Sequence, residues 1–340
     1  MNLAVLFGGI SPERNVSIAG GKAVINALKE NGHNVKAIDP ALGNNGLITD
    51  DDLSNTELFP SQEELAKYHT RNLLDCVNSD IFDDVEVAFL VLHGTNGEDG
   101  RLQALLELRG IPYTGSGVKA SALGIDKNSS KMLFAAAGIP TPPWVTLTNE
   151  DFENFDYFAE IRSDLGNHLV VKPNDQGSTI GISIIDSGNL DDIHTAVKLA
   201  SEYSELVLIE QYIPGREITV GLIGGEVLPV IEIIPEGGFY DYRHKYSKGQ
   251  TQYICPAEIS EDVAEFAQTL AHSAFNALGC SGFARADFRL TDEGQPFLME
   301  INTIPGFTST SLVPMAAKEV GIEFPELCER IIEIALENKK

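Results

Sequence analysis

Short apolar runs that end at glycine constrain the fold of this chain most. Residues 3–7 are apolar and are followed by two glycines, and residues 85–92 form a nearly continuous apolar run. A continuous apolar strand is typical of a parallel sheet covered by helices on both faces. Apolar and polar residues do not alternate along such a strand, because both of its faces are buried. Helical spacing over residues 17–29 and a strand pattern at 34–38 complete a strand–helix–strand order. The sequence therefore predicts that an α/β sheet opens the chain.

The strands in the second half have a different pattern. Apolar and polar residues alternate over long stretches, which favours an antiparallel sheet with one covered face. These stretches are residues 217–223, 226–234, 282–290 and 296–301. A long amphipathic helix is predicted at 260–278. An α+β unit is thus expected in this half.

The length of 340 residues suits about two to three domains. We predict an N-terminal α/β domain over residues 1–120, a central α+β domain over 121–214 and a C-terminal α+β domain over 215–340. Residues 41–80 are rich in Gly, Asn, Asp and Ser. We interpret them as an insertion in the first domain, with one short helix near 63–69.

The charge balance excludes some functions. Lys and Arg number 24 and Asp and Glu number 50, so the net charge is −26. A chain this acidic is a poor general binder of nucleic acid or of an anionic membrane. The longest apolar runs have about six residues, far fewer than the roughly 20 of a membrane-spanning helix. The first residues lack the basic segment of a secretion signal, so we expect a cytoplasmic protein.

The cysteines argue against a zinc or dithiol redox site. They are scattered and form no CxxC pair. We predict that all four are buried free thiols, as is usual in a reducing compartment: Cys76, Cys255, Cys280 and Cys328.

Two glycine-rich turns could bind a ligand. Residues 8–17 join a strand to a helix, and a helix N-terminus favours a carboxylate or phosphate. The spacing is not that of a dinucleotide or P-loop, and such a turn is often only structural. His93 follows the buried strand at its carboxyl end, where open parallel sheets bind ligands. His93 could instead only brace its loop.

Lys172 ends a predicted strand and is followed by the Gly-Ser loop 177–181. A lysine beside such a loop is suited to hold phosphate oxygens. The alternative is a surface lysine beside a plain hairpin. Glu210 and Glu217 also end or begin strands, but spacing alone assigns them no role.

The most informative cluster lies near the C-terminus. Arg285 and Asp287 are two residues apart on one strand, and Glu300 and Asn302 are two apart on the next, so each pair shares a face. If the strands pair, two carboxylates and an amide oxygen converge. Such hard oxygen ligands suit Mg²⁺ shared with phosphates, and Arg285 could stabilise an oxyanion. The alternative is a surface ladder of ion pairs.

Together these motifs resemble the D-alanine–D-alanine ligases of the ATP-grasp superfamily, over nearly the whole chain. The most specific segments are LHGTNGEDGRLQ (92–103), FYDYRHKY (239–246) and MEINTIPGFTSTSLVP (299–314). GGISPERNVS (8–17), DK (126–127), VKP (171–173), GSTIG (177–181) and IEQYIPGRE (209–217) add to the resemblance. It implies a three-domain ATP-grasp fold in which two α+β domains that follow a parallel α/β domain sandwich ATP.

The resemblance implies a ligase that forms D-alanyl-D-alanine for peptidoglycan precursors. The carboxylate of one D-alanine would take the γ-phosphoryl group of ATP, and the amine of the second would displace phosphate. Two Mg²⁺ or Mn²⁺ ions are implied at Asp287, Glu300 and Asn302. The nucleotide residues implied are Lys127, Lys172, Ser178, Glu210, Ile213, Glu217, Phe239 and Lys245, with Lys245 reaching the transferring phosphate.

The resemblance also implies the amino-acid subsites. Glu13 would hold the ammonium of the first D-alanine with His93 close by, and Ser311 and Leu312 would receive the carboxylate of the second. Arg285 and the Gly306 N–H would stabilise the oxyanion. Glu13, Ser178 and Tyr246 would form a hydrogen-bonded triad, and a lid around residues 239–250 would exclude water.

Two departures and two alternatives remain. The loop has Thr179 where a second serine is common, and Arg243 and His244 place positive charge beside Lys245. A relative that uses D-serine, D-lactate or an L-amino acid as second substrate is an alternative, although Tyr246 favours a dipeptide. A nucleotide-binding regulator with a decayed site is another. The family also implies a homodimer formed through the first domain.

Overall fold

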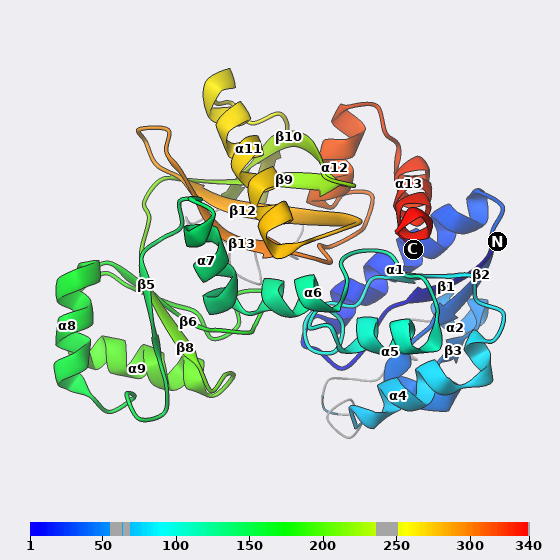
Figure 1. The fold of residues 1–340 in the computed structure, drawn as a ribbon, viewed down its shortest axis with the longest axis horizontal. Helices are drawn as coiled ribbons and strands as arrows, with labels where there is room; N and C mark the ends of the chain where they lie inside the picture. The colour runs from blue at the N-terminus through cyan, green and yellow to red at the C-terminus, as the bar shows by residue number, and fades with distance from the viewer. Residues whose placement is uncertain (55–62, 64–68, 236–250, 339–340) are drawn as a thin grey trace.

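The computed structural model describes residues 1–54, 63, 69–235 and 251–338. It contains three sheets, and Figure 1 shows the first and the central sheet at opposite ends of the molecule with the third sheet above and between them. Among the helices of these residues, none combines the length and apolar character that crossing a bilayer would need.

The first sheet has the predicted parallel core. Its order is β3 (Leu47–Ile48), β2 (Asn34–Ile38), β1 (Asn2–Leu6) and β4 (Val87–Leu90), and only the β2–β3 pairing is antiparallel. Every residue of β4 is buried, as expected for a strand covered on both faces. Helix α1 (Arg14–Glu30) follows the loop after β1. Helices α5 (Arg101–Arg109) and α6 (Val118–Ile125) come after β4.

Residues 41–80 are more structured than the sequence analysis predicted. They contribute most of a 3₁₀ turn (Pro40–Asn45), the edge strand β3, and the helices α2 (Asp50–Ser54) and α4 (Arg71–Asn78). Leu73, Cys76 and Val77 of α4 are buried in the same core as β1 and β4. Part of this stretch therefore packs in the first core, and its interpretation as an insertion stays a prediction. The short helix predicted near 63–69 lies almost entirely outside the described residues.

The central sheet is antiparallel, with the order β5 (Trp144–Leu147), β8 (Val207–Gln211), β6 (Leu169–Pro173) and β7 (Ser183–Ile185). The helices α8 (Phe155–Leu165) and α9 (Leu190–Ser201) pack with its strands in a core of their own. Sequence reasoning missed β5, which has only four residues, and it missed α8, although Phe158, Ile161 and Leu165 have helical spacing.

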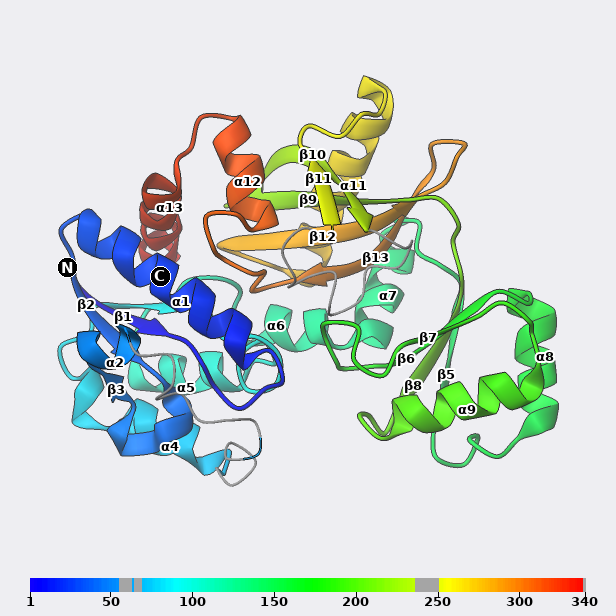
Figure 2. The ribbon, with the colours of Figure 1, turned by 180° about the vertical axis from the view of Figure 1, so that it is seen from behind.

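The third sheet confirms the predicted antiparallel unit. Its order is β11 (Thr251–Ile254), β10 (Glu226–Pro235), β9 (Arg216–Ile223), β12 (Phe283–Leu290) and β13 (Pro296–Asn302). Helix α11 (Glu261–Leu278) packs against it, as Figure 2 shows from behind, and α7 (Lys127–Ala136) contributes Phe134 to the same core. Helices α12 (Leu312–Glu319) and α13 (Phe324–Glu337) follow the sheet.

The buried apolar residues that the structure describes form three cores, and the C-terminal helix belongs to the core of the first sheet. Leu327 and Ile331 of α13 belong to the core of the first sheet, and His33 lies 2.8 Å from Glu329, so the chain ends are packed together. The central sheet shares no core cluster with the first sheet among the described residues. The predicted boundaries at 120 and 214 stay a prediction, and α7 packs with the third sheet rather than with the central one.

The cysteine prediction holds with one exception. All four thiols are free, and Cys76, Cys280 and Cys328 are buried, but Cys255 is only half-buried. Burial raises the pKa of each thiol, to about 12 for Cys76 and about 11 for Cys255, so both thiols are protonated near neutral pH.

A buried ion pair fixes the turn after β1. Arg14 and Asp39 form a salt bridge with side chains only 2% and 0% exposed. Arg14 also donates to the Gly9 carbonyl at 2.7 Å, and the Gly9 N–H donates to Asp39 at 3.1 Å. The pair therefore ties the glycine turn and the start of α1 to the end of β2, immediately beside Glu13.

We expect Asp39→Ala to destabilise the protein by about 3–5 kcal/mol, because it leaves the Arg14 cation buried without this carboxylate. The exposed pair Arg330–Glu326 provides a control, and Glu326→Ala should cost less than about 1 kcal/mol. Urea unfolding of both variants measures the difference. Equal losses would contradict a special role for the buried pair.

Candidate active site

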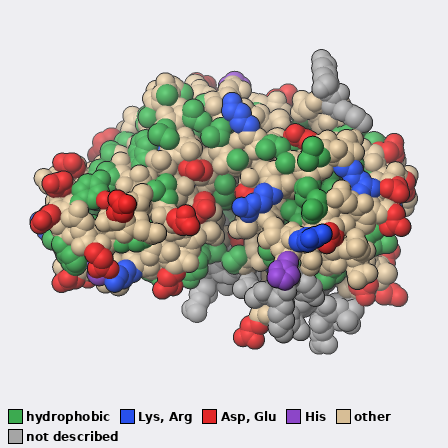
Figure 3. All heavy atoms as spheres, turned by 60° about the horizontal axis from the view of Figure 1, so that its bottom comes forward, with side chains coloured by type: hydrophobic (Ala, Val, Ile, Leu, Met, Phe, Trp, Pro, Cys, Tyr) green, Lys and Arg blue, Asp and Glu red, His purple; other side chains and the backbone are tan. Residues whose placement is uncertain are grey.

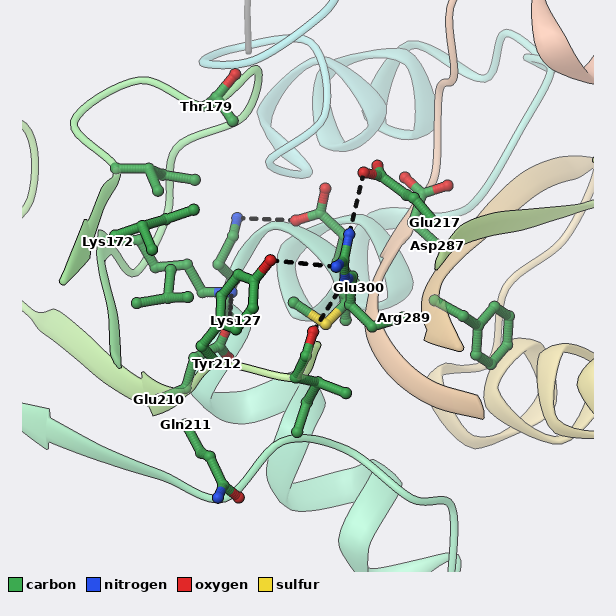
Figure 4. A pocket seen from close by; sticks show the side chains of 16 residues that line it. Lys127, Lys172, Thr179, Glu210, Gln211, Tyr212, Glu217, Asp287, Arg289 and Glu300 are labelled. Carbon is green, nitrogen blue, oxygen red and sulfur yellow. Dashed lines mark hydrogen bonds and ion pairs between the residues drawn. The ribbon is translucent and has the colours of Figure 1, made fainter. Parts of the chain in front are cut away.

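A pocket lies between the central sheet and the third sheet. Its space between atoms, including the solvent at its open mouth, is about 890 Å³. Figure 4 shows polar side chains from both sheets pointing into it. The lining residues are Lys127, Val170, Lys172, Thr179, Ile182, Ile184, Glu210, Gln211, Tyr212, Ile213, Glu217, Asp287, Phe288, Arg289, Met299 and Glu300.

Two lysines bind one buried carboxylate in the pocket wall. Lys172 Nζ is 2.5 Å from Glu210 Oε1, and Lys131 Nζ is 2.9 Å from Glu210 Oε2. Burial raises the pKa of the Glu210 carboxyl, but the two ammonium groups outweigh it, so the pKa lies below its usual value. Burial lowers the pKa of Lys131 to about 8, against the opposing effect of Glu210. Glu210 is thus an ionised acceptor held in place by two cations.

The other end of the pocket is organised by an arginine that sequence analysis missed. Arg289 donates to the carbonyls of Ile213 at 3.1 Å and Gly215 at 2.7 Å, and its guanidinium lies 5.5 Å from the Tyr212 ring centroid. It also lies 3.9 Å from Glu217. Arg289 therefore fixes the connection between β8 and β9. Arg289 lies two residues after Asp287 and four after Arg285, so all three share one face of the strand. This spacing could have predicted that Arg289 belongs to the site.

The structure brings together most of the residues predicted for the nucleotide. Lys127, Lys172, Glu210, Ile213 and Glu217 all line this pocket. Two others, Phe239 and Lys245, lie outside the described residues, as does Tyr246.

The predicted strand pairing of the C-terminal cluster is confirmed. In the register of β12 and β13, Asp287 lies opposite Glu300 and Arg285 lies opposite Asn302. Arg285 donates to both oxygens of Asp287 at 2.8 and 2.7 Å. Glu300 lies 3.2 Å from Lys127 Nζ. Each carboxylate therefore has a cation beside it in this structure.

This donor set fits a divalent ion that is also bound by phosphates. Two carboxylates and one amide oxygen are the hard ligands that Mg²⁺ prefers, and Mg²⁺ usually takes only one or two carboxylates. Within the described part of the chain, no three His, Cys, Asp or Glu side chains gather as a complete metal site. Phosphate oxygens of a substrate and water would complete the coordination of such an ion.

A second polar cluster adjoins the pocket through the Gly-Ser loop. Ser178 donates to Glu13, and the neighbouring Thr179 lines the pocket. Both loop residues have positive φ, 50° and 61°. Consecutive non-glycine residues in this region are strained, and such strain is commonly found at functional sites. Two predicted members of the triad are therefore in contact.

His93 and Glu98 hold the loop that follows β13. His93 Nδ1 donates to the Ile304 carbonyl at 2.9 Å, while the Ile304 N–H donates to Glu98 at 3.3 Å. The Gly94 N–H donates to Glu98 at 2.6 Å. Burial lowers the pKa of His93, so the imidazole is neutral with its proton on Nδ1. His93 Nε2 is buried and has no hydrogen-bond partner among the described residues.

The loop held by His93 and Glu98 leads to the remaining predicted residues. Ser311 is the N-cap of α12 and Leu312 is its first residue. Ser311 Oγ accepts from the Thr308 N–H at 2.9 Å, and a Cβ placed on Gly306 would lie 3.7 Å from Ser311 Oγ. Gly306, Ser311 and Leu312 thus lie together at a helix N-terminus, which favours a carboxylate.

Two family models match the chain. One, described as D-ala D-ala ligase N-terminus, matches residues 2–116, and the other, described as D-ala D-ala ligase C-terminus, matches residues 133–333. The D-alanine--D-alanine ligase of Methylacidiphilum infernorum is 42% identical over 334 residues, covering 98% of this chain and 95% of the relative. That of Gloeobacter violaceus is 42% identical over 339 residues, covering 99% and 100%.

Solved structures are similar over the same length. The crystal structure of D-alanine--D-alanine ligase from Bacillus anthracis complexed with ATP has a TM-score of 0.78 and 32% identity, and covers 100% of this chain and 98% of that one. Another structure of the Bacillus anthracis enzyme has the same TM-score at 35% identity.

Glu98 should make stability depend on pH. Burial and the nearby Glu13 raise the pKa of Glu98 from 4.5 to about 8. The folded protein therefore keeps a proton that the unfolded chain loses near pH 4.5. The contribution of Glu98 to the free energy of unfolding is full below pH 4.5 and is lost as the pH rises through about 8. Glu98→Gln cannot titrate, and its urea-unfolding free energy should fall less than that of the wild type between these pH values. The exposed Glu326→Gln is the control, and identical slopes for wild type and Glu98→Gln would contradict the assignment.

Proposed function

The chain belongs to the D-alanine–D-alanine ligase family, and we propose that the site described above forms D-alanyl-D-alanine from two D-alanines and ATP. The product serves peptidoglycan precursor synthesis in this family. The observation that carries the assignment of the site is the register of β12 and β13. It sets Arg285, Asp287, Glu300 and Asn302 on one face, and Asp287 and Glu300 line a pocket that also contains Lys127 and Lys172.

The reaction needs activation because a carboxylate is a poor electrophile. A carboxylate oxygen of the first D-alanine attacks the γ-phosphorus of ATP, the bond to the bridging oxygen breaks, and ADP leaves. The amine of the second D-alanine, having lost a proton, attacks the acyl carbon, and the tetrahedral intermediate expels inorganic phosphate. Catalysis of such phosphoryl transfer is mainly positioning and charge stabilisation.

For the nucleotide, Lys127 and Lys172 supply positive charge to the phosphates. Their side chains are 6% and 5% exposed, so solvent screens them little. Glu210 and the Ile213 backbone bind the adenine, and Glu217 binds the ribose. The acidic excess of the chain is found on its outer surface, where Figure 3 shows Asp and Glu side chains spread over one face, and it does not reverse this local field.

Asp287, Glu300 and Asn302 would hold two Mg²⁺ or Mn²⁺ ions together with phosphate oxygens. The ions would neutralise the charge that develops on the transferring group. Each of the two carboxylates has a cation beside it, Arg285 for Asp287 and Lys127 for Glu300.

For the amino acids, Glu13 receives the ammonium of the first D-alanine. The neutral His93 directs an acceptor nitrogen, Nε2, toward the buried space beside it. Arg285 and the Gly306 N–H stabilise the oxyanion. Ser311 and Leu312 receive the carboxylate of the second D-alanine at the N-terminus of α12, where the helix dipole favours negative charge. Phe239 stacks on the adenine and Lys245 reaches the transferring phosphate. Ser178 and Tyr246 close the site together with Glu13.

The test is phosphate release from Mg²⁺ and ATP with D-alanine, L-alanine, D-serine, or D-alanine plus D-lactate, with products identified by mass. Release should require D-alanine, yield its dipeptide and stop when EDTA removes the metal. Arg285→Met should lower kcat by about 10²–10³-fold, which excludes a contaminating ATPase. A depsipeptide product, or release without any amino acid, would contradict the proposal.

We further infer a homodimer formed through the first domain. Leu74 of α4 and Leu108 of α5 are 40% and 87% exposed on neighbouring helices, an apolar surface that a second copy would cover. Light scattering should give the mass of two chains, and Leu108→Asp should shift it toward one chain. Leu199→Asp, at a leucine of α9 that is 40% exposed, is the control. A wild-type monomer would contradict the inference.

A further inference from the structure

Lys131 lies one turn after Lys127 on α7 and is not among the residues that line the pocket. It is nevertheless completely buried, and its ammonium group bonds to Glu210 at 2.9 Å. Burying an ammonium group is costly unless it is paired. A lysine in this place therefore needs an explanation beyond packing.

The charges around Glu210 explain why a lysine is buried at position 131. In the pocket wall the carboxylate has two cations, Lys172 on Oε1 and Lys131 on Oε2, and only Lys172 lines the pocket (Figure 4). A nucleotide's phosphates compete with Glu210 for Lys172. With Lys172 as its sole partner, Glu210 would lose its countercharge whenever Lys172 turned to the phosphates. A buried carboxylate without a partner is strongly destabilising.

Lys131, in contrast, is held in place from several sides. It donates to Thr141 Oγ1 at 2.8 Å, and its ammonium group lies 5.2 Å from the centroid of the Trp144 ring. Trp144 faces Glu210 across the β5–β8 pairing, and its Nε1–H donates to Asn128 at 2.9 Å. Such a cation–aromatic contact adds to the ion pair when it is shielded from water. Lys131 is therefore fixed beside Glu210, away from the pocket.

We propose that Lys131 is a positioning residue that supplies the permanent countercharge of Glu210, so that Lys172 is free to bind the nucleotide phosphates while Glu210 stays ionised toward the adenine. The proposal rests on the roles of Lys172 and Glu210 given under the proposed function. It assigns Lys131 no contact with substrate.

Binding measurements test this role without turnover. Isothermal titration calorimetry gives the Kd of Mg²⁺–AMP-PNP and of Mg²⁺–tripolyphosphate for the wild type and each variant. Lys131→Met should weaken AMP-PNP binding at least about tenfold, because Glu210 then retains Lys172. Thr141→Val removes a hydrogen bond of Lys131 but no charge, and it should change the Kd less than about threefold.

A second substitution separates this role from simple packing. Lys131→Met/Glu210→Gln removes the carboxylate that retains Lys172, so tripolyphosphate binding should return to within about threefold of the wild type. AMP-PNP should keep less of its advantage over tripolyphosphate than in the wild type, because a neutral amide oxygen replaces the carboxylate that faces the adenine. A merely structural Lys131 would lower the folded fraction of Lys131→Met but would leave the tripolyphosphate Kd of the folded protein unchanged.

Trp144, the only tryptophan, reports on local folding in every variant. Lys131→Gln is measured in parallel and carries the same expectation if Lys131→Met does not fold. Wild-type affinity in the uncharged variants, or no rescue in the double variant, would overturn the proposal. A wild type that binds neither probe would overturn the proposed function itself, which is a distinguishable result.

Discussion

The pairing of β12 with β13 is the constraint on which the rest of the site depends. Ala286 and Ile301 pack into the core beneath α11, and this fixes which residues lie on the opposite face. A slip of one residue would exchange the two faces and bury Asp287 or Glu300 in that core. The register changes just after Asp287, where an irregularity lets both Met299 and Glu300 line the pocket. Core packing therefore positions the carboxylates.

The two walls of the pocket belong to different hydrophobic cores. The first sheet and helix α13 share one core, whereas the central sheet has its own. The pocket lies between the central sheet and the third sheet, so its two walls belong to separately packed units. Polar contacts link these walls, among them Arg289 with the carbonyls after β8 and Lys131 with Glu210. These charged contacts across the boundary therefore help to hold the two walls in place.

Local patterns predicted many of the elements well. The boundaries of β2 agree with the prediction of a strand at 34–38, and the long alternating strands form the expected antiparallel sheet. Prediction missed β5 and α8, and the polar composition of residues 41–80 hid the buried face of α4. It also missed Lys131, Glu98 and Arg289. Each is a charged residue whose role depends on a partner distant in sequence.

The sequence by itself determined the types of residue, their alternation along strands and hence which of them share a face. Only the tertiary structure decided which faces meet. Glu13 reaches Ser178 across 165 positions, His93 reaches Ile304 across 211, and Lys131 reaches Glu210 across 79. The physical reason is that periodicity is a local property of the chain, whereas these contacts follow from how apolar faces distant in sequence pack and set the strand register.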